Sequence, residues 1–267
     1  MIPAKLEYTR PETLDEALSA LSQPEAKALA GGQSLVSVLK LRLVRPSVLV
    51  DIGRLDLRGV RVRQNELRIG ALTTWAELTT APELERPALR GIAECAEGIG
   101  DLQVKNRGTI GGSLAHADPA SDMPAMLIAL GARLTVRSAD TERVVTAEEF
   151  FLGPFLTALE PHELLTEVVV PVPPSGSGSA YEAIEHPASG FALAGAAVRA
   201  HPDGTRTIGV TGIGARPFRL DGTLDEADVF GDDYATETYK RHVAHVVLER
   251  AAARAQTRAE EDRTWKA

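Results

Sequence analysis

The chain has 267 residues, 44% of them apolar, and a formal charge of −8 at pH 7. This length favours two domains with sizeable cores, and the negative charge argues against a nucleic-acid partner, which requires a basic face. No apolar run reaches the roughly 18 residues of a membrane span, and the N-terminus lacks a basic region followed by an apolar signal core, so we predict a cytoplasmic protein without a membrane span.

The first elements alternate between helix and strand. Thr13 and Glu16 have the spacing of a capping box, and apolar residues follow at helical spacing until Pro24. Residues 26–30 then predict a strand. This strand leads into the first glycine segment, Ala30-Gly31-Gly32-Gln33-Ser34-Leu35.

Further short elements follow before the middle of the chain. Residues 48–52 and 67–69 predict strands, Thr74 with Glu77 forms a second capping box, and residues 87–96 predict a helix. That helix contains the single cysteine of the chain, Cys95, which its apolar surroundings predict to be a core residue. One cysteine excludes an internal disulfide and cannot by itself hold an iron–sulfur cluster or a structural zinc.

A polar stretch at residues 103–125 contains the second glycine segment, residues 108–113, with Gly108, Gly111 and Gly112. Glycine lets the backbone approach an anion, so that successive N–H groups can point at phosphate oxygens. A helix predicted from about residue 123 to 130 places the stretch at a helix N-terminus, which favours an anion. Either glycine segment alone is equally consistent with a tight turn. Together they predict a diphosphate held from two sides, and therefore a dinucleotide.

The second half begins at a stretch of prolines, glycines and serines, residues 171–178, which we interpret as a flexible linker. Residues 180–185, 191–200 and 207–214 have strand character and predict a small antiparallel sheet. Residues 234–260 predict an amphipathic helix. The glycines at residues 209–214 resemble a dinucleotide fingerprint but lack a following helix, so we interpret them as sheet and turn.

The two glycine segments, followed in order by residues 40–43, 49–52, 164–167 and 209–214, resemble the FAD-binding medium subunit of the molybdenum hydroxylases, the family of carbon monoxide dehydrogenase and xanthine dehydrogenase. The resemblance implies an α+β fold. A two-lobed FAD-binding domain of the vanillyl-alcohol-oxidase (PCMH) type would span residues 1–174. A small C-terminal domain with an antiparallel sheet and helices would span residues 175–267.

The resemblance also implies which residues contact FAD, bound noncovalently. In the first segment they are Ala30, Gly31, Gly32, Gln33, Ser34 and Leu35. In and after the second they are Thr109, Ile110, Gly111, Gly112, Ser113, Ala117, Ser121 and Asp122. Leu165 matches a position near the flavin. Noncovalent FAD favours a structural or hydrogen-bonding role for His116 over a covalent flavin anchor. No metal ligand and no catalytic side chain is expected.

The chain departs from the family near Tyr181. Relatives often carry a lysine two residues after this aromatic, where this chain has Ala183, and Glu185 and His186 replace basic residues nearby. A removed positive charge would disfavour an anionic reduced flavin.

The implied function is electron transfer within an assembly. A large partner chain would carry a molybdenum–pterin cofactor and a small partner chain two [2Fe–2S] clusters, in a dimer of heterotrimers, and FAD here would pass electrons to an external acceptor. Two alternatives stay open at this point: a self-sufficient FAD-dependent oxidoreductase, and a nonredox nucleotide-binding module. The sequence does not identify the substrate or the acceptor.

Overall fold

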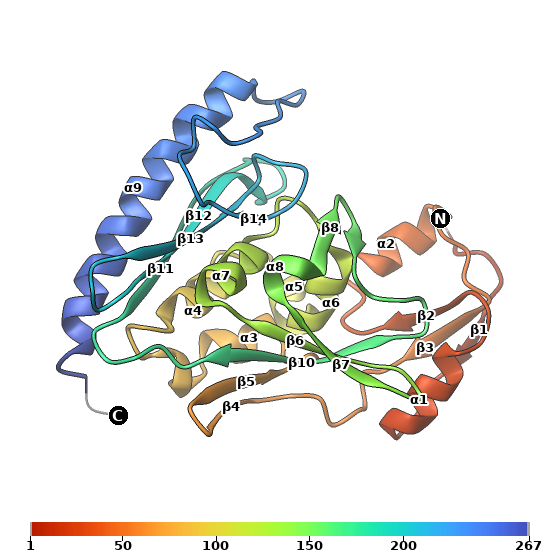
Figure 1. Cartoon of the computed structure of the whole chain (residues 1–267). Helices are drawn as coiled ribbons and strands as arrows, with labels where there is room; N and C mark the ends of the chain where they lie inside the picture. The colour runs from red at the N-terminus through yellow and green to blue at the C-terminus, as the bar shows by residue number, and fades with distance from the viewer. Residues whose placement is uncertain (1, 266–267) are drawn as a thin grey trace.

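A computed structural model describes residues 2–265 of the chain. Figure 1 shows three parts side by side: a small N-terminal lobe, a central sheet covered by helices, and a second sheet crossed by one long C-terminal helix. Within residues 2–265, no helix is long and apolar enough to cross a membrane.

The N-terminal lobe is a three-stranded parallel sheet in the order β1-β3-β2. The Thr13 side chain accepts a hydrogen bond from the Glu16 N–H, and the Glu16 carboxylate accepts one from the Thr13 N–H, which confirms the predicted capping box. The buried side chains of the first helix and the third strand form the core of the lobe. The elements are β1 (Glu7–Thr9), α1 (Leu14–Leu21), β2 (Ala26–Leu29), α2 (Leu35–Lys40) and β3 (Val48–Asp51).

The central sheet is antiparallel, in the order β4-β5-β10-β6-β7. Leu67 and Ile69 are fully buried on the face that the helices cover, whereas Glu66 and Arg68 lie on the opposite face, as strand alternation requires. The strands are β4 (Val60–Arg63), β5 (Glu66–Gly70), β6 (Arg133–Arg137), β7 (Glu142–Thr146) and β10 (Leu164–Pro171).

The helices over this sheet come mostly from the segment between β5 and β6. The second predicted capping box, at Thr74 and Glu77, is confirmed, and Cys95 is buried as expected. The helices are α3 (Trp75–Thr79), η1 (Pro82–Leu84), α4 (Arg90–Glu97), α5 (Leu102–Arg107), α6 (Ile110–His116), α7 (Asp122–Leu130) and α8 (Ala147–Phe150). A small hairpin, β8 (Phe151–Gly153) with β9 (Leu156–Thr157), follows α8.

The C-terminal sheet is antiparallel, as predicted, in the order β11-β12-β13-β14. One face packs against the alanine-rich side of the long helix, and α7 packs against β12 and β13. The glycines at residues 209–214 lie in a strand and turn, which confirms the interpretation against a dinucleotide fingerprint. The elements are β11 (Gly178–Glu185), β12 (Ala192–Ala200), β13 (Arg206–Thr211), β14 (Phe218–Arg219) and α9 (Glu237–Asp262).

The segment at residues 171–178 is not the flexible linker that its composition suggested. Ser177 is fully buried, and the Gly176 N–H donates to the buried Asp262 carboxylate of α9 at 3.0 Å. Tyr181 and Ala197 of the C-terminal sheet belong to the same core cluster as the helices over the central sheet. The division into domains at residue 174 stays a prediction, because the two parts share a core.

Candidate functional site

The two glycine segments meet, although about 75 residues separate them in the sequence. A Cβ atom on Gly31 would lie 2.0 Å from the Arg107 carbonyl oxygen and 2.9 Å from the Gly108 Cα. A Cβ on Gly112 would lie 3.5 Å from the Ala30 Cβ. The fold therefore places the first segment, from the N-terminal lobe, directly against the second, from the helices of the central part.

The first segment has free hydrogen-bond donors. Among residues 2–265, no protein acceptor pairs with the backbone N–H groups of Gly31, Gly32, Gln33 or Ser34, and the Ser34 hydroxyl has no hydrogen bond either. Gly32 has φ = 74°, a left-handed conformation that glycine adopts without strain. A run of unpaired N–H groups at a turn is suited to an anion.

The second segment is mostly helical, and this corrects the expectation of a loop. Gly111 and Gly112 lie inside α6, and the Gly111 N–H donates to the Ala71 carbonyl at 2.8 Å. The N–H groups of Ile110, Gly112 and Ser113 are also paired within the protein. The expectation that these groups point at phosphate is wrong.

The glycines of α6 instead permit close packing. A Cβ on Gly111 would lie 2.6 Å from the Ala71 Cβ and 2.7 Å from the Ala71 carbonyl oxygen. Thr109 caps the helix by accepting from the Gly112 N–H, and its own N–H has no acceptor among the described residues. The second segment therefore packs against the first and has one backbone N–H group, that of Thr109, without a protein acceptor among the described residues.

A strip that includes the partly exposed Ser113, His116 and Asp122 and the buried Ser121 continues from this point to the N-terminus of α7. The hydroxyl oxygens of Ser113 and Ser121 lie 3.4 Å apart. Ala117 ends α6 in a left-handed conformation with φ = 53°. Its carbonyl accepts a hydrogen bond from the N–H of Phe155, a residue that also has a positive φ, 54°. His116 packs on Phe155 with ring centroids 5.1 Å apart, and partial burial lowers the pKa of its imidazole.

Asp122 is the first residue of α7 and lies at the end of this polar strip. Burial, with a smaller contribution from the negative charge of Glu185, raises the pKa of its carboxyl to about 7, although a hydrogen bond from the Tyr181 hydroxyl opposes the rise. Sequence reasoning treated Tyr181 only as a landmark for the family. Its contact with Asp122 spans 59 positions, and no local pattern indicates it.

Some predicted contacts leave little surface for a ligand. Ile110 and Gly111 are buried, and Leu165 is only 3% exposed in the core of the central part. Their assignment as FAD contacts stays a prediction. Among residues 2–265, no group of three or more histidine, cysteine, aspartate or glutamate side chains could hold a metal ion.

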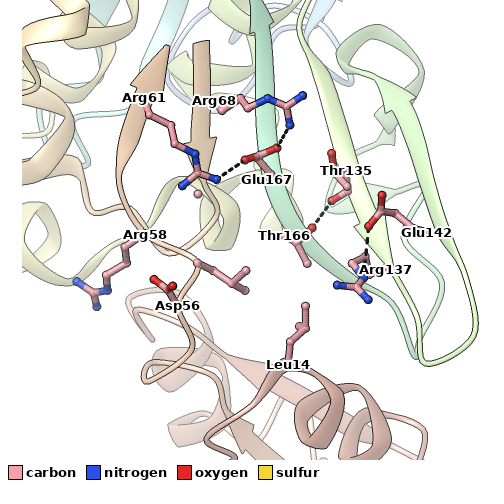
Figure 2. Close-up of a pocket in the computed structure, with 12 residues that line it drawn as sticks. Leu14, Asp56, Arg58, Arg61, Arg68, Thr135, Arg137, Glu142, Thr166 and Glu167 are labelled. Atoms are coloured by element: carbon pink, nitrogen blue, oxygen red, sulfur yellow. Dashed lines mark hydrogen bonds and ion pairs between the residues drawn. The ribbon is translucent and has the colours of Figure 1, made fainter. Parts of the chain in front are cut away.

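A separate hollow lies between Leu14 of α1 and the helix-free face of the central sheet, and Figure 2 shows its lining. Its arginines are already neutralised: Arg61 and Arg68 share Glu167, with N–O distances of 3.0 and 2.6 Å. Arg58 and Arg137 pair with glutamates as well. The hollow contains no glycine segment, so we assign it no ligand.

Comparison with known proteins identifies the family to which the chain belongs. The family model described as the FAD binding domain in molybdopterin dehydrogenase matches residues 4–173. The chain belongs to this family. It is similar to the carbon monoxide dehydrogenase medium chain of Afipia carboxidovorans, with 36% identity covering 97% of this chain and 99% of that relative. It is also similar to the 6-hydroxypseudooxynicotine dehydrogenase complex subunit alpha of Paenarthrobacter nicotinovorans, with 35% identity and 97% of each chain covered.

The fold agrees with that membership. The solved structure of reconstituted CO dehydrogenase from Oligotropha carboxidovorans superposes with a TM-score of 0.89 at 35% identity, covering 97% of this chain and 100% of that one. The predicted fold class is thereby confirmed. The chain is an FAD-binding medium subunit of a dehydrogenase of the molybdenum hydroxylase type, and hence part of a multi-subunit oxidoreductase.

The residues present fit this cofactor. FAD contains a diphosphate, and the unpaired N–H groups of the first segment and of Thr109 are donors of the kind that phosphate oxygens accept. Because Gly31 has no Cβ, the backbones of the two segments that carry these donors lie in contact.

Proposed function

We propose that this chain is the electron-transfer subunit of its complex. It would accept electrons from [2Fe–2S] clusters of a small partner chain and pass them to an external acceptor. A large partner chain would carry the molybdenum–pterin cofactor, and the complex would be a dimer of heterotrimers. The end-to-end likeness to medium chains supports this assignment.

The lack of metal ligands among the described residues supports the same assignment of the iron–sulfur clusters to a partner chain. Its only cysteine, Cys95, is buried in α4, and among residues 2–265 no group of three or more histidine, cysteine, aspartate or glutamate side chains could hold a metal ion. An iron–sulfur cluster needs four ligands, so electrons from a molybdenum centre must reach this chain through a partner.

For the cofactor site we propose that Gly31, Gly32, Gln33 and Ser34 donate N–H groups to one side of the FAD diphosphate and Thr109 donates from the other. Ser113, Ser121 and Asp122 would contact the remainder of the cofactor along the polar strip. Four buried residues would act mainly by shaping the wall behind it: Ile110, Gly111, Ala117 and Leu165. We propose that Ala30, Leu35 and Gly112 complete this site.

Bound FAD supplies the two-electron chemistry of its isoalloxazine ring. The protein binds the diphosphate, orients the ring and sets the charge around it. No side chain in the strip is required as a general base. Position and electrostatics are the contributions of this chain.

The decisive experiment is reconstitution with and without partners. The complex is purified from its native cell, analysed for molybdenum, iron and FAD, and then separated into chains. Small subunit reduced with dithionite and desalted is mixed with this chain, and flavin absorbance is followed by stopped flow. We expect rapid bleaching with cluster-loaded small subunit and none with cluster-free small subunit.

Two outcomes would contradict the proposal. Fast flavin reduction by the oxidisable substrate with this chain alone would favour a self-sufficient oxidoreductase. Absence of flavin absorbance from the intact complex would favour a nonredox nucleotide-binding module. Acid precipitation of the complex should release the flavin as FAD, because no covalent anchor is expected.

A further inference from the structure

The hydroxyl of Tyr181 donates a hydrogen bond to the Asp122 carboxylate. Tyr181 lies in β11 and Asp122 begins α7, so the contact joins the C-terminal sheet to the proposed FAD site. The neighbouring strand accommodates the hydroxyl: a Cβ on Gly195 of β12 would lie 2.2 Å from the Tyr181 oxygen. Any larger residue at Gly195 would displace the hydroxyl from its partner.

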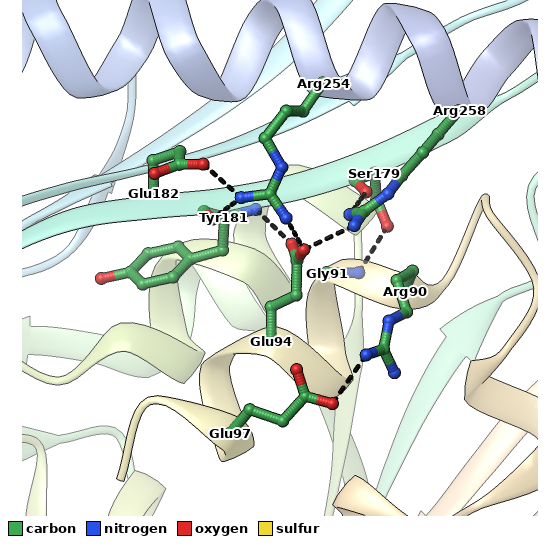
Figure 3. A network of polar contacts seen from close by, with 9 residues as sticks. All are labelled: Arg90, Gly91, Glu94, Glu97, Ser179, Tyr181, Glu182, Arg254 and Arg258. Carbon is green, nitrogen blue, oxygen red and sulfur yellow. Dashed lines mark hydrogen bonds and ion pairs between the residues drawn. The ribbon is translucent and has the colours of Figure 1, made fainter. Parts of the chain in front are cut away.

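The backbone of Tyr181 is fixed independently. Its N–H donates to Glu94 of α4 at 3.0 Å, and Figure 3 shows the same carboxylate receiving Arg254 and Arg258 from α9. Arg258 also donates to the Ser179 carbonyl at 2.7 Å. Because Glu94 is only 10% exposed in its side chain, water competes weakly for these contacts. Two elements, α4 and α9, thus hold β11 at the position from which Tyr181 reaches Asp122.

The N-terminus of α7 is held from the same sheet on its other side. The Thr211 hydroxyl of β13 lies within hydrogen-bond distance of the carbonyl oxygens of Ser121, at 2.8 Å, and Pro119, at 2.9 Å. The Gly212 N–H donates to the Pro119 carbonyl at 3.0 Å. The Asp122 carboxyl therefore has a position set by β11 and β13 rather than by its own helix alone.

The charged and titratable groups around Asp122 come from two elements. β11 contributes Tyr181 and Glu185, and α4 contributes Glu94 and Cys95. Burial raises the pKa of the Cys95 thiol well above its usual range. The nearby residues of β12 and β13, Gly195 and Thr211, do not titrate. β11 contains no lysine or arginine, so no basic residue of this strand compensates the Asp122 charge.

We propose that Tyr181 is a positioning residue that holds the Asp122 carboxyl at the FAD site, where this carboxyl takes up a proton when the flavin is reduced. The inference rests on the proposed function, because it requires FAD to contact Asp122. Two electrons and one proton enter the flavin and leave one negative charge on it. A second proton converts the Asp122 carboxylate to the acid, which removes the repulsion between the two charges.

The proton count is measurable without turnover. For a two-electron couple each proton taken up changes the midpoint potential by about 30 mV per pH unit. We expect the wild-type complex, titrated with dithionite against reference dyes, to show a slope near two protons per two electrons over a range beginning close to pH 7. In Asp122→Asn the slope in that range should fall to one proton.

Substitutions of the two neighbours of Asp122, Tyr181 and Glu185, should shift the pH range of two-proton uptake in opposite directions. Tyr181→Phe removes a hydrogen bond that favours the carboxylate, so the two-proton range should shift to higher pH. Glu185→Gln removes a negative charge and should shift it to lower pH. Tyr8→Phe is the matched control, because its hydroxyl donates to Asp51 at 2.5 Å on the exposed surface of the N-terminal lobe. It should leave the slope unchanged.

The outcomes separate this inference from the proposed function. Wild-type complex without FAD would refute the proposed function and the inference together. FAD-loaded Asp122→Asn with the wild-type slope would refute the inference alone. If Tyr181→Phe fails to fold, Asp122→Asn and Glu185→Gln still decide, and an unchanged profile in both overturns the proposal.

Discussion

Gly31→Ala should weaken FAD binding by forcing the two glycine segments apart. The added Cβ would lie 2.0 Å from the Arg107 carbonyl oxygen and 2.8 Å from the Arg107 carbonyl carbon. Both contacts are with backbone, so no side chain can rotate away. The segments would have to separate by about 1.4 Å to bring the 2.0 Å approach to an ordinary contact of 3.4 Å, at a cost typical of overpacking, about 1–3 kcal/mol.

That separation is large compared with the tolerance of a hydrogen bond. Losing one hydrogen bond to the charged diphosphate costs about 1.5–3 kcal/mol, which is about a ten- to hundred-fold increase in the Kd for FAD. The assay is titration of the apoprotein with FAD, followed by flavin fluorescence. Thermal unfolding of the apoprotein measures the packing cost separately, and for a chain of this size a shift of about 2–4 °C is expected per kcal/mol.

The matched control is Gly100→Ala. A Cβ at Gly100 meets nothing within 4 Å, and its backbone needs no left-handed conformation. This variant should bind FAD as the wild type does. An apoprotein of Gly31→Ala that is destabilised as expected but retains wild-type FAD affinity would refute the idea that both segments hold one diphosphate.

Three further predictions concern single side chains. Ser34→Ala removes a hydroxyl without a protein partner, so the Kd for FAD should rise about ten-fold while the Tm of the apoprotein stays unchanged; an unchanged Kd would remove Ser34 from the site. Asp262→Asn breaks the buried pair with Arg86, whose Nε lies 2.8 Å away, and should cost about 3–5 kcal/mol in urea unfolding; a loss below 1 kcal/mol would show that the pair is dispensable. The hydrogen bond from Lys240 lowers the pKa of Asp232 to about 2, so this carboxylate stabilises the fold fully above its usual pKa of 3.8 and loses that effect as pH falls toward 2. Asp232→Asn should therefore lower the free energy of unfolding at neutral pH but not near pH 2. An equal loss at both pH values would contradict this origin.

Local patterns in the sequence predicted several elements, but not the strands β4, β6, β7 and β10 of the central sheet or the helix α6. The capping boxes at Thr13 and Thr74 depend on residues three positions apart, and such contacts form whenever the helix forms. The strand that leads into the first glycine segment and the antiparallel sheet after residue 177 follow from alternation and turn residues in the same way. The resemblance then supplied the cofactor, because the order of the two glycine segments is itself a property of the sequence.

The sequence by itself determined which elements form, which family the chain belongs to and where the glycines stand, since these depend on residues close together in the chain. Only the tertiary structure decided what the glycines do. Gly31 and Gly111 contact backbone of distant segments, so their need for a missing Cβ depends on how the lobes pack. The same holds for Tyr181 and Asp122, which meet across two separate sheets and helices. Composition suggested a flexible linker at residues 171–178, but burial under α9 and the Asp262 contacts overrode that preference, because packing free energy exceeds the small intrinsic bias of proline, glycine and serine toward loops.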